Sequence, residues 1–385
     1  MADSDRLGDG QPWPGRPAHG GAGPELLRSG VIDFSASINP YAPPPGLRRA
    51  VLAADFKPYP DPWSGRLAGL IAAAHRISPE QVLVGNGATE LIFILARALL
   101  GPGHRALVVG PAFGEYAYAS ALSGSQVSVY HAPAEAGFFP DPEEVLELVG
   151  RLRPMVTWVA NPANPAGIYL PRGFFEALLE AGPGILVVDE AYRSFVESAW
   201  ASEPLLDTGR LLLLRSLTKD FGLAGLRLGY LLGPAGLIRR IAAHQPPWAV
   251  NSLAQAAGEF IFTRAYGFME TCRVRIGRRR RELREALTGL GLWVSDSAAN
   301  FLLVRTGDGA GCARFLLEGH GLLVRDCTSF GLPQYVRVAV LKRAENRRLA
   351  AGLAAWVTLR PGAPPLPPAG PNQAAVRDGN RDRPR

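Results

Sequence analysis

The stretch RSLTKDFGLAGLRLGY, Arg215 to Tyr230, follows directly on the apolar run Leu211 to Leu214. It places one lysine, Lys219, next to hydroxyl residues and before a glycine-rich segment that carries Arg227. A lysine withdrawn from water is costly unless its pKa falls or it reacts chemically. The stretch therefore predicts a strand that ends at a reactive, partly desolvated amine.

Working outward from this stretch, short apolar runs alternate with helical patterns along the chain. QVLVG precedes TELIFILARALL, RALVVG precedes FGEYAYASALSG, and MVTWVA precedes PRGFFEALLEAG, before GILVVDEAY and LLLLRSL follow. Such alternation is typical of a mostly parallel sheet covered by helices. We expect an α/β fold with a large, mostly parallel mixed sheet between helices and a smaller α+β C-terminal lobe.

The change of pattern along the chain predicts five segments. They are a disordered or lid-like N-terminal arm (1–24), a segment that packs with the small lobe (25–48), a large domain (49–288), a small C-terminal domain (289–359) and a disordered tail (360–385). The two ends are rich in Pro, Gly, Arg and Asp and lack apolar periodicity, which is the reason for expecting disorder there.

Composition excludes several classes of protein. Of 385 residues, 47% are hydrophobic and 19% charged, and no apolar run is long enough to cross a bilayer. The N-terminus lacks the order of a secretory signal, so we expect a cytoplasmic protein. Three widely spaced cysteines, Cys272, Cys312 and Cys327, indicate neither a disulfide framework nor a metal site.

The net charge of +7 comes largely from RVRIGRRRRELRE, Arg273 to Glu285, and from arginines of the C-terminal tail. Without interleaved aromatic residues or a nucleic-acid-binding motif, we interpret this segment as a solvated helix face. No nucleic-acid partner is expected, and the role of residues 273–284 stays open.

Polar residues follow several predicted strands, at the edge where ligands bind in such sheets. VGNGATELI places Gly87, Ala88 and Thr89 at a helix start whose free N–H groups can hold a phosphate. VVDEAY ends an apolar strand on Asp189, a buried carboxylate that needs a cationic partner. Each feature alone has a structural explanation, because glycine-rich helix starts and buried aspartates are common.

Taken with Lys219, these groups are what pyridoxal phosphate requires. Lys219 would hold the cofactor aldehyde covalently, and Asp189 would keep the pyridine nitrogen protonated. The other expected cofactor contacts are Ser216 and Arg227 at the phosphate with Gly87, Ala88 and Thr89, Phe113 on the ring, and Asn164 and Tyr192 at the phenolic oxygen. Lys219, Asp189 and Tyr192 form the expected catalytic set.

The motifs NPANPAG, DEAY, SLTK and GLRLGY occur in one order over residues 161–230. These motifs, in this order, resemble those of the fold-type I pyridoxal-phosphate enzymes of the aspartate aminotransferase superfamily. The resemblance extends over about residues 19–358. HGG, DFSASINP, RDCTSF and YVRVAV resemble most closely the threonine-phosphate decarboxylases of cobalamin synthesis. Histidinol-phosphate aminotransferases share the cofactor motifs and remain the alternative, and a non-catalytic cofactor-sensing module is a remote one.

The resemblance implies a phosphorylated amino-acid substrate, L-threonine O-3-phosphate, converted to (R)-1-amino-2-propanol O-2-phosphate and CO₂. Arg325 and Arg337 would hold the substrate phosphate, aided by His19, whereas in a transaminase Arg337 would pin a carboxylate. Ser35 and Asn164 complete the expected substrate site. The resemblance also implies a homodimer with shared active sites, because relatives use the tyrosine at Tyr59 to reach the neighbouring subunit's cofactor.

Overall fold

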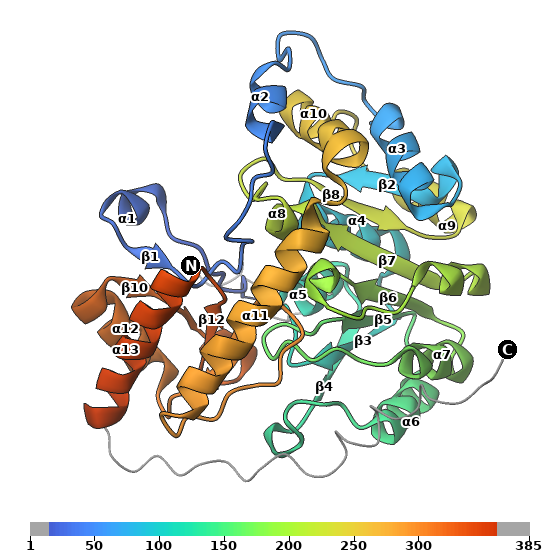
Figure 1. Ribbon diagram of the computed structural model, residues 1–385. Coiled ribbons are helices and arrows are strands. Elements are labelled where there is room, and N and C mark those ends of the chain that lie inside the picture. The colour runs from blue at the N-terminus through green and yellow to red at the C-terminus, as the bar shows by residue number, and fades with distance from the viewer. Residues whose placement is uncertain (1–14, 360–385) are drawn as a thin grey trace, which may run out of the picture.

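The computed structural model describes residues 15–359, and its main feature is a seven-stranded mixed sheet (Figure 1). Our expectations for residues 1–14 and 360–385 lie outside the described residues. The strands, in spatial order, are β2 (Val82–Gly85), β8 (Gly229–Leu232), β7 (Leu211–Ser216), β6 (Ile185–Asp189), β5 (Val156–Ala160), β3 (Arg105–Gly110) and β4 (Gln126–His131). Of the seven strands, β8 alone runs in the direction opposite to the other six.

Apolar side chains line both faces of the sheet, because successive residues of a strand point to opposite sides. Alternate strand residues therefore fall into two hydrophobic clusters, one on each face. One face packs against α4 (Gly87–Leu99), α5 (Glu115–Leu122) and α9 (Ala235–Ala242). The opposite face packs against α3 (Gly65–His75), α6 (Pro142–Leu152), α7 (Arg172–Ala181), α10 (Ser252–Phe260) and α11 (Phe268–Thr288).

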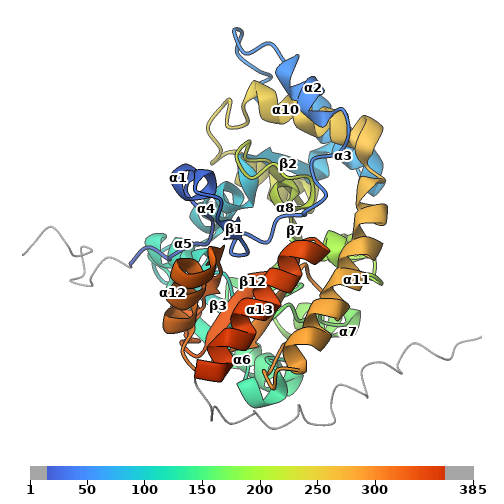
Figure 2. The same cartoon turned by 60° about the vertical axis from the view of Figure 1, so that its left-hand side comes forward.

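A smaller lobe lies at one side of the large sheet (Figures 1 and 2). It holds the antiparallel sheet β11 (Arg325–Asp326), β12 (Tyr335–Ala339) and β9 (Phe301–Arg305), with α12 (Gly309–His320) and α13 (Arg343–Leu359). Near the N-terminus, β1 (Ile32–Asp33) pairs in parallel with β10 (Leu322–Leu323), so the first described segment joins this lobe. The predicted fold class is confirmed.

The remaining elements connect these layers. They are α1 (Pro24–Arg28), α2 (Leu47–Leu52), the short α8 (Leu217–Asp220), and the 3-10 turns η3 (Arg193–Phe195) and η4 (Glu203–Thr208). A π-helical turn, Ile261–Ala265, follows α10. Within residues 15–359, no helix combines the length and apolarity needed to span a membrane.

Candidate active site

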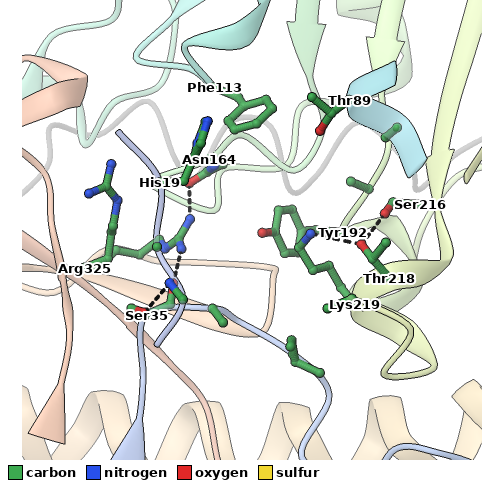
Figure 3. A pocket seen from close by; sticks show the side chains of 18 of the residues that line it. His19, Ser35, Thr89, Phe113, Asn164, Tyr192, Ser216, Thr218, Lys219 and Arg325 are labelled. Atoms are coloured by element: carbon green, nitrogen blue, oxygen red, sulfur yellow. Dashed lines mark hydrogen bonds between the residues drawn. The ribbon is translucent and has the colours of Figure 1, made fainter. Parts of the chain in front are cut away.

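A cavity of about 800 Å³ lies where the carboxyl ends of β5, β6 and β7 face the small lobe and the N-terminal segment. It brings together residues from both ends of the described chain (Figure 3). The predicted site residues that line it are His19, Ser35, Ala88, Thr89, Phe113, Asn164, Asp189, Tyr192, Ser216, Lys219, Arg227, Arg325 and Arg337.

Lys219 lies on the single turn of α8, which follows β7 directly. Its Nζ donates a 3.0 Å hydrogen bond to Thr218 Oγ1, and Thr218 Oγ1 is 2.6 Å from Ser216 Oγ. Burial, followed by the charges of Arg227 and Arg337, lowers the pKa of Lys219 to about 8. The amine is therefore partly unprotonated near neutral pH, as a nucleophile or base requires.

Asp189, the last residue of β6, is buried and fixed by two donors. Tyr116 Oη donates to Oδ2 at 2.6 Å, and the Ala191 N–H donates to Oδ1 at 2.8 Å. Burial raises the pKa of this carboxyl, against the hydrogen bond from Tyr116. No ion pair to Asp189 occurs within residues 15–359, so its carboxylate would gain stability from a cationic ligand group.

The sequence analysis gave no role to Tyr116, which stacks on Trp158 with ring centroids 5.3 Å apart. Tyr116 lies in the first turn of α5, and its N–H donates to the Phe113 carbonyl at 3.3 Å, so a turn brings the two rings to 5.8 Å between centroids. Thr218 was likewise quoted in SLTK without a role.

The start of α4 and the loop before β8 form one end of the cavity. Gly87 has φ +82°, and a Cβ built there would lie 2.5 Å from Arg227 Nη2. Arg227 itself has φ +63°, and its Nη1 donates to the Ala224 carbonyl. Free N–H groups of a helix start beside an arginine make an anion site, and only glycine leaves the arginine room.

A second group of cations lies across the cavity. Arg325 of β11 and Arg337 of β12 are direct cross-strand partners. Arg337 is 5% exposed, and donates to Asn164 Oδ1 and to the Ser35 carbonyl, each at 2.6 Å. Burial and the neighbouring charge of Arg337 lower the pKa of Arg325. Like charges directly opposite each other are destabilising, so a bound anion would stabilise this pair.

The N-terminal segment crosses the cavity mouth. Arg325 Nη2 donates to the Ala18 carbonyl at 2.7 Å, and Ser35 Oγ accepts from the Gly21 N–H at 2.7 Å. His19 Nε2 lies 2.7 Å from Glu115 Oε1, a carboxylate that the sequence analysis did not single out. His19 thus lines the cavity but contacts protein, whereas we expected it to contact the substrate phosphate.

Phe113, Tyr192 and Asn164 also line the cavity (Figure 3). The Phe113 ring centroid is 5.5 Å from that of His19, and the Tyr192 ring packs edge-on against Phe301. Burial raises the pKa of the Tyr192 hydroxyl, while the charge of Arg337 opposes that rise. The contacts predicted for all three with a bound ring stay predictions.

Two predicted residues do not line the cavity. Gly87 is in close contact with the Arg227 guanidinium, and it is Arg227 that lines the cavity. Tyr59 is 82% exposed, and its ring stacks at 4.9 Å on Trp248. Exposed aromatic residues surround it on the loop between α2 and α3, namely Phe56 and Trp63.

These groups fit pyridoxal phosphate. Arg227, Ser216 and the start of α4 would hold its phosphate, Asp189 would pair with its ring nitrogen, and Lys219 would meet its aldehyde. Asp189 lacks an ion-pair partner among the described residues, and the Gly87–Arg227 approach forms a compact anion site. The fold and cavity define an enzyme of the fold-type I, pyridoxal-phosphate-dependent class.

Comparison with known proteins identifies the family. Residues 29–353 match the family of class I and II aminotransferases, to which the chain belongs. Histidinol-phosphate aminotransferase 1 of Carboxydothermus hydrogenoformans is 34% identical over 327 residues, which cover 84% of this chain and 92% of the relative. The chain is therefore an enzyme of the pyridoxal-phosphate-dependent aminotransferase family, and the predicted cofactor is confirmed.

Solved structures show the same fold. Histidinol-phosphate aminotransferase from Sinorhizobium meliloti, in complex with pyridoxal-5′-phosphate, has a TM-score of 0.78 at 25% identity and covers 88% of this chain and 95% of its own. L-threonine-O-3-phosphate decarboxylase from Porphyromonas gingivalis has a TM-score of 0.74 at 27% identity and covers 85% of this chain and 100% of its own.

The expected activity, threonine-phosphate decarboxylation, is wrong. Eight curated relatives at 30–34% identity are all histidinol-phosphate aminotransferases, and they match over most of this chain. The expectation depended on motifs at the chain ends, around His19, Arg325 and Arg337. These residues line the cavity, and two arginines there do not distinguish the two activities, because both substrates carry a phosphate.

Proposed function

We propose that the protein is a histidinol-phosphate aminotransferase, which transfers the amino group of histidinol phosphate to a keto acid such as 2-oxoglutarate. Eight curated relatives at 30–34% identity, all histidinol-phosphate aminotransferases, support this most strongly, and the geometry of the cavity is compatible with it. Two arginines, Arg325 and Arg337, face each other across adjacent strands and line the same cavity as Lys219. A phosphorylated amine and a dicarboxylic keto acid must bind here in turn, and each supplies an anion that would stabilise this pair.

The bound cofactor supplies the aldehyde that takes up the amino group and a ring that accepts electrons from the substrate Cα. Lys219 would move the proton at that carbon, because its amine has a pKa of about 8 and lies inside the cavity. Asp189 would hold a proton on the ring nitrogen, and Tyr116 keeps the carboxylate oriented through its 2.6 Å hydrogen bond.

Orientation at Cα decides which bond reacts, so the position of the held anion matters. Arg337 is suited to fix it, because hydrogen bonds to Asn164 and to the Ser35 carbonyl hold its guanidinium on two sides. Arg325 joins it from the neighbouring strand. The segment around His19 would exclude water from the mouth of the cavity.

We also propose a homodimer with shared active sites. The loop between α2 and α3 exposes Phe56 by 81%, Tyr59 by 82% and Trp63 by 60%, and Trp248 beside them is 46% exposed. Grouped exposed aromatic residues are typical of a protein interface. In a dimer Tyr59 would reach the partner's cofactor phosphate, which explains why it does not line its own cavity.

Steady-state turnover tests this function. The purified, cofactor-loaded protein is given histidinol phosphate with 2-oxoglutarate, and glutamate formation is followed over many turnovers. We expect one glutamate for each keto phosphate formed, and none when either substrate is omitted. Absence of glutamate from an otherwise folded, cofactor-loaded protein would overturn the proposal.

A further inference from the structure

Behind the cavity, on the side of β6 and β7 that faces away from it, lies a chain of buried charged side chains. Glu190 follows Asp189, and Arg215 precedes Ser216. Because side chains alternate along a strand, Asp189 and Ser216 point into the cavity while Glu190 and Arg215 do not. Arg215 Nε donates to Glu190 Oε2 at 2.6 Å. The two strand ends that carry cavity residues are thus joined from behind.

The chain continues in both directions. Arg215 Nη2 donates to Glu203 Oε1 at 3.0 Å and to Ser202 Oγ at 3.1 Å, both from the region of η4. His75 of α3 lies between Glu203 Oε1, 3.0 Å from its Nδ1, and Tyr230 Oη, 2.9 Å from its Nε2. Tyr230 of β8 is the cross-strand partner of Arg215. Arg215, Glu203, His75 and Tyr230 therefore follow one another in a closed series of contacts at the end of β7.

At the other end, Arg193 Nε lies 3.3 Å from Glu190 Oε1. No hydrogen bond joins these two atoms, so the contact is one of opposite charges only, whereas Arg193 Nη2 donates to the Trp200 carbonyl at 2.7 Å. Arg193 directly follows Tyr192, so these contacts lie next to the residue that lines the cavity. The two arginines and two glutamates balance in charge. Burial lowers the pKa of His75, against its hydrogen bond with Glu203.

We propose that Glu190, Arg193, Glu203, Arg215 and His75 form a positioning network, which fixes Asp189, Tyr192 and Ser216 in the geometry that the cofactor requires. The Glu190 side chain is fully buried, and those of His75 and Arg215 are 4% and 11% exposed. Well-packed apolar residues of similar volume often stabilise a fold as well as buried ion pairs do. Stability alone therefore does not explain so many buried charges, whereas fixed hydrogen-bond geometry does. The inference concerns the cofactor and is independent of the substrate proposed above.

The test is the double variant Glu190→Gln/Arg215→Met. It removes one charge of each sign, so the net charge of the network is unchanged, while Arg193 keeps its hydrogen bond to the Trp200 carbonyl and Glu203 keeps its contact with His75. We expect cofactor to dissociate about 10- to 100-fold more readily, since small displacements of binding groups are costly. The pH midpoint of the bound cofactor's absorption should also shift, because Asp189 no longer lies in its native position.

Two matched controls separate positioning from stability. Arg172→Met breaks the exposed pair with Glu176 and should change neither readout. Val149→Ala creates a small cavity in α6, away from the active site, and should lower the melting temperature without changing the cofactor's dissociation constant or absorption midpoint. If the double variant does not fold, Glu203→Gln at the partly exposed end is measured in the same way, with a shift of about threefold expected. Wild-type cofactor affinity and absorption midpoint in the folded variant would overturn the proposal.

Discussion

The two sides of the cavity are built in different ways. On the cofactor side, Asp189, Ser216 and Lys219 lie at or just beyond the ends of two paired strands, and a buried charge network supports them from behind. On the substrate side, Ser35, Asn164 and Arg337 come from segments up to 302 residues apart and meet through two hydrogen bonds. The cofactor side depends on one sheet, whereas the substrate side depends on how the small lobe meets the large one.

The largest effect is expected on the cofactor side. Lys219→Ala removes the amine that both meets the aldehyde and moves the substrate proton, so transamination should fall by about 10³-fold or more. Steady-state glutamate formation measures it. Cofactor should still bind without covalent attachment, because Arg227 and the start of α4 remain. Retention of near-normal turnover would contradict the role of Lys219.

On the substrate side, Arg337→Met should cost about 2–5 kcal/mol in kcat/KM, or roughly 30- to several-thousand-fold, because a buried anion loses its partner. The cofactor dissociation constant should stay within about threefold of the wild type, since Arg337 is placed with substrate. Arg305→Met is the control, because Arg305 lies on the same small sheet and bonds Gln334. If Arg337→Met weakened cofactor binding as much as it lowered kcat/KM, the distinction between the cofactor side and the substrate side would be wrong.

A third wall of the site is expected from a second subunit. Phe56→Glu places a charge in the exposed aromatic group around Tyr59, and should weaken dimerisation by about 30-fold or more. Sedimentation velocity over a concentration series measures this. Val274→Glu, at an equally apolar position that is 69% exposed on α11, is the control. A wild-type protein that is monomeric at micromolar concentration would contradict the shared site.

The pKa of Lys219 predicts how cofactor incorporation depends on pH. With a pKa of about 8, the unprotonated fraction, and with it the rate of incorporation, should fall about tenfold per pH unit below 8 and level off above it. Between about pH 8 and 10.5 the unfolded lysine binds a proton that the folded one does not, so this group makes stability rise with pH. An incorporation rate that keeps rising up to pH 10 would show that the pKa of Lys219 is that of a solvent-exposed lysine.

The smallest effect is expected at the cavity mouth. His19→Ala removes a half-exposed ring whose protein contact is Glu115, so KM for histidinol phosphate should change by about two- to fivefold with kcat unchanged. Glu115→Gln keeps the shape of the contact and should change KM less. A loss of kcat above about 100-fold would place His19 among the catalytic residues instead.

This comparison also shows how far the sequence could be interpreted. The cofactor side could be predicted because its groups follow strand-like runs in one order, and Lys219, Asp189, Ser216 and Arg227 line one cavity. The large sheet and the small lobe were expected for the same reason, the alternation of apolar runs with helical patterns. Tertiary packing brings about the contacts of Tyr116, of Glu115 and of the charge network. The spacing of residues along the sequence does not reveal such contacts.

The substrate was predicted wrongly for a physical reason. Arginines and a histidine near the chain ends indicate an anion, and phosphates of different substrates are alike to a guanidinium. What distinguishes decarboxylation from amino transfer is the direction of one bond at Cα. That direction depends on how the substrate's anionic group is held in the folded cavity, which the sequence does not record.

Single-turnover spectroscopy distinguishes amino transfer from decarboxylation. Histidinol phosphate is added to the cofactor-loaded protein without a keto acid, and the absorption of the bound cofactor is followed. For an aminotransferase we expect stoichiometric conversion to pyridoxamine phosphate, and return of the original spectrum when 2-oxoglutarate is added. An unchanged cofactor with histidinol phosphate, together with repeated CO₂ release from L-threonine O-3-phosphate in the absence of keto acid, would contradict amino transfer.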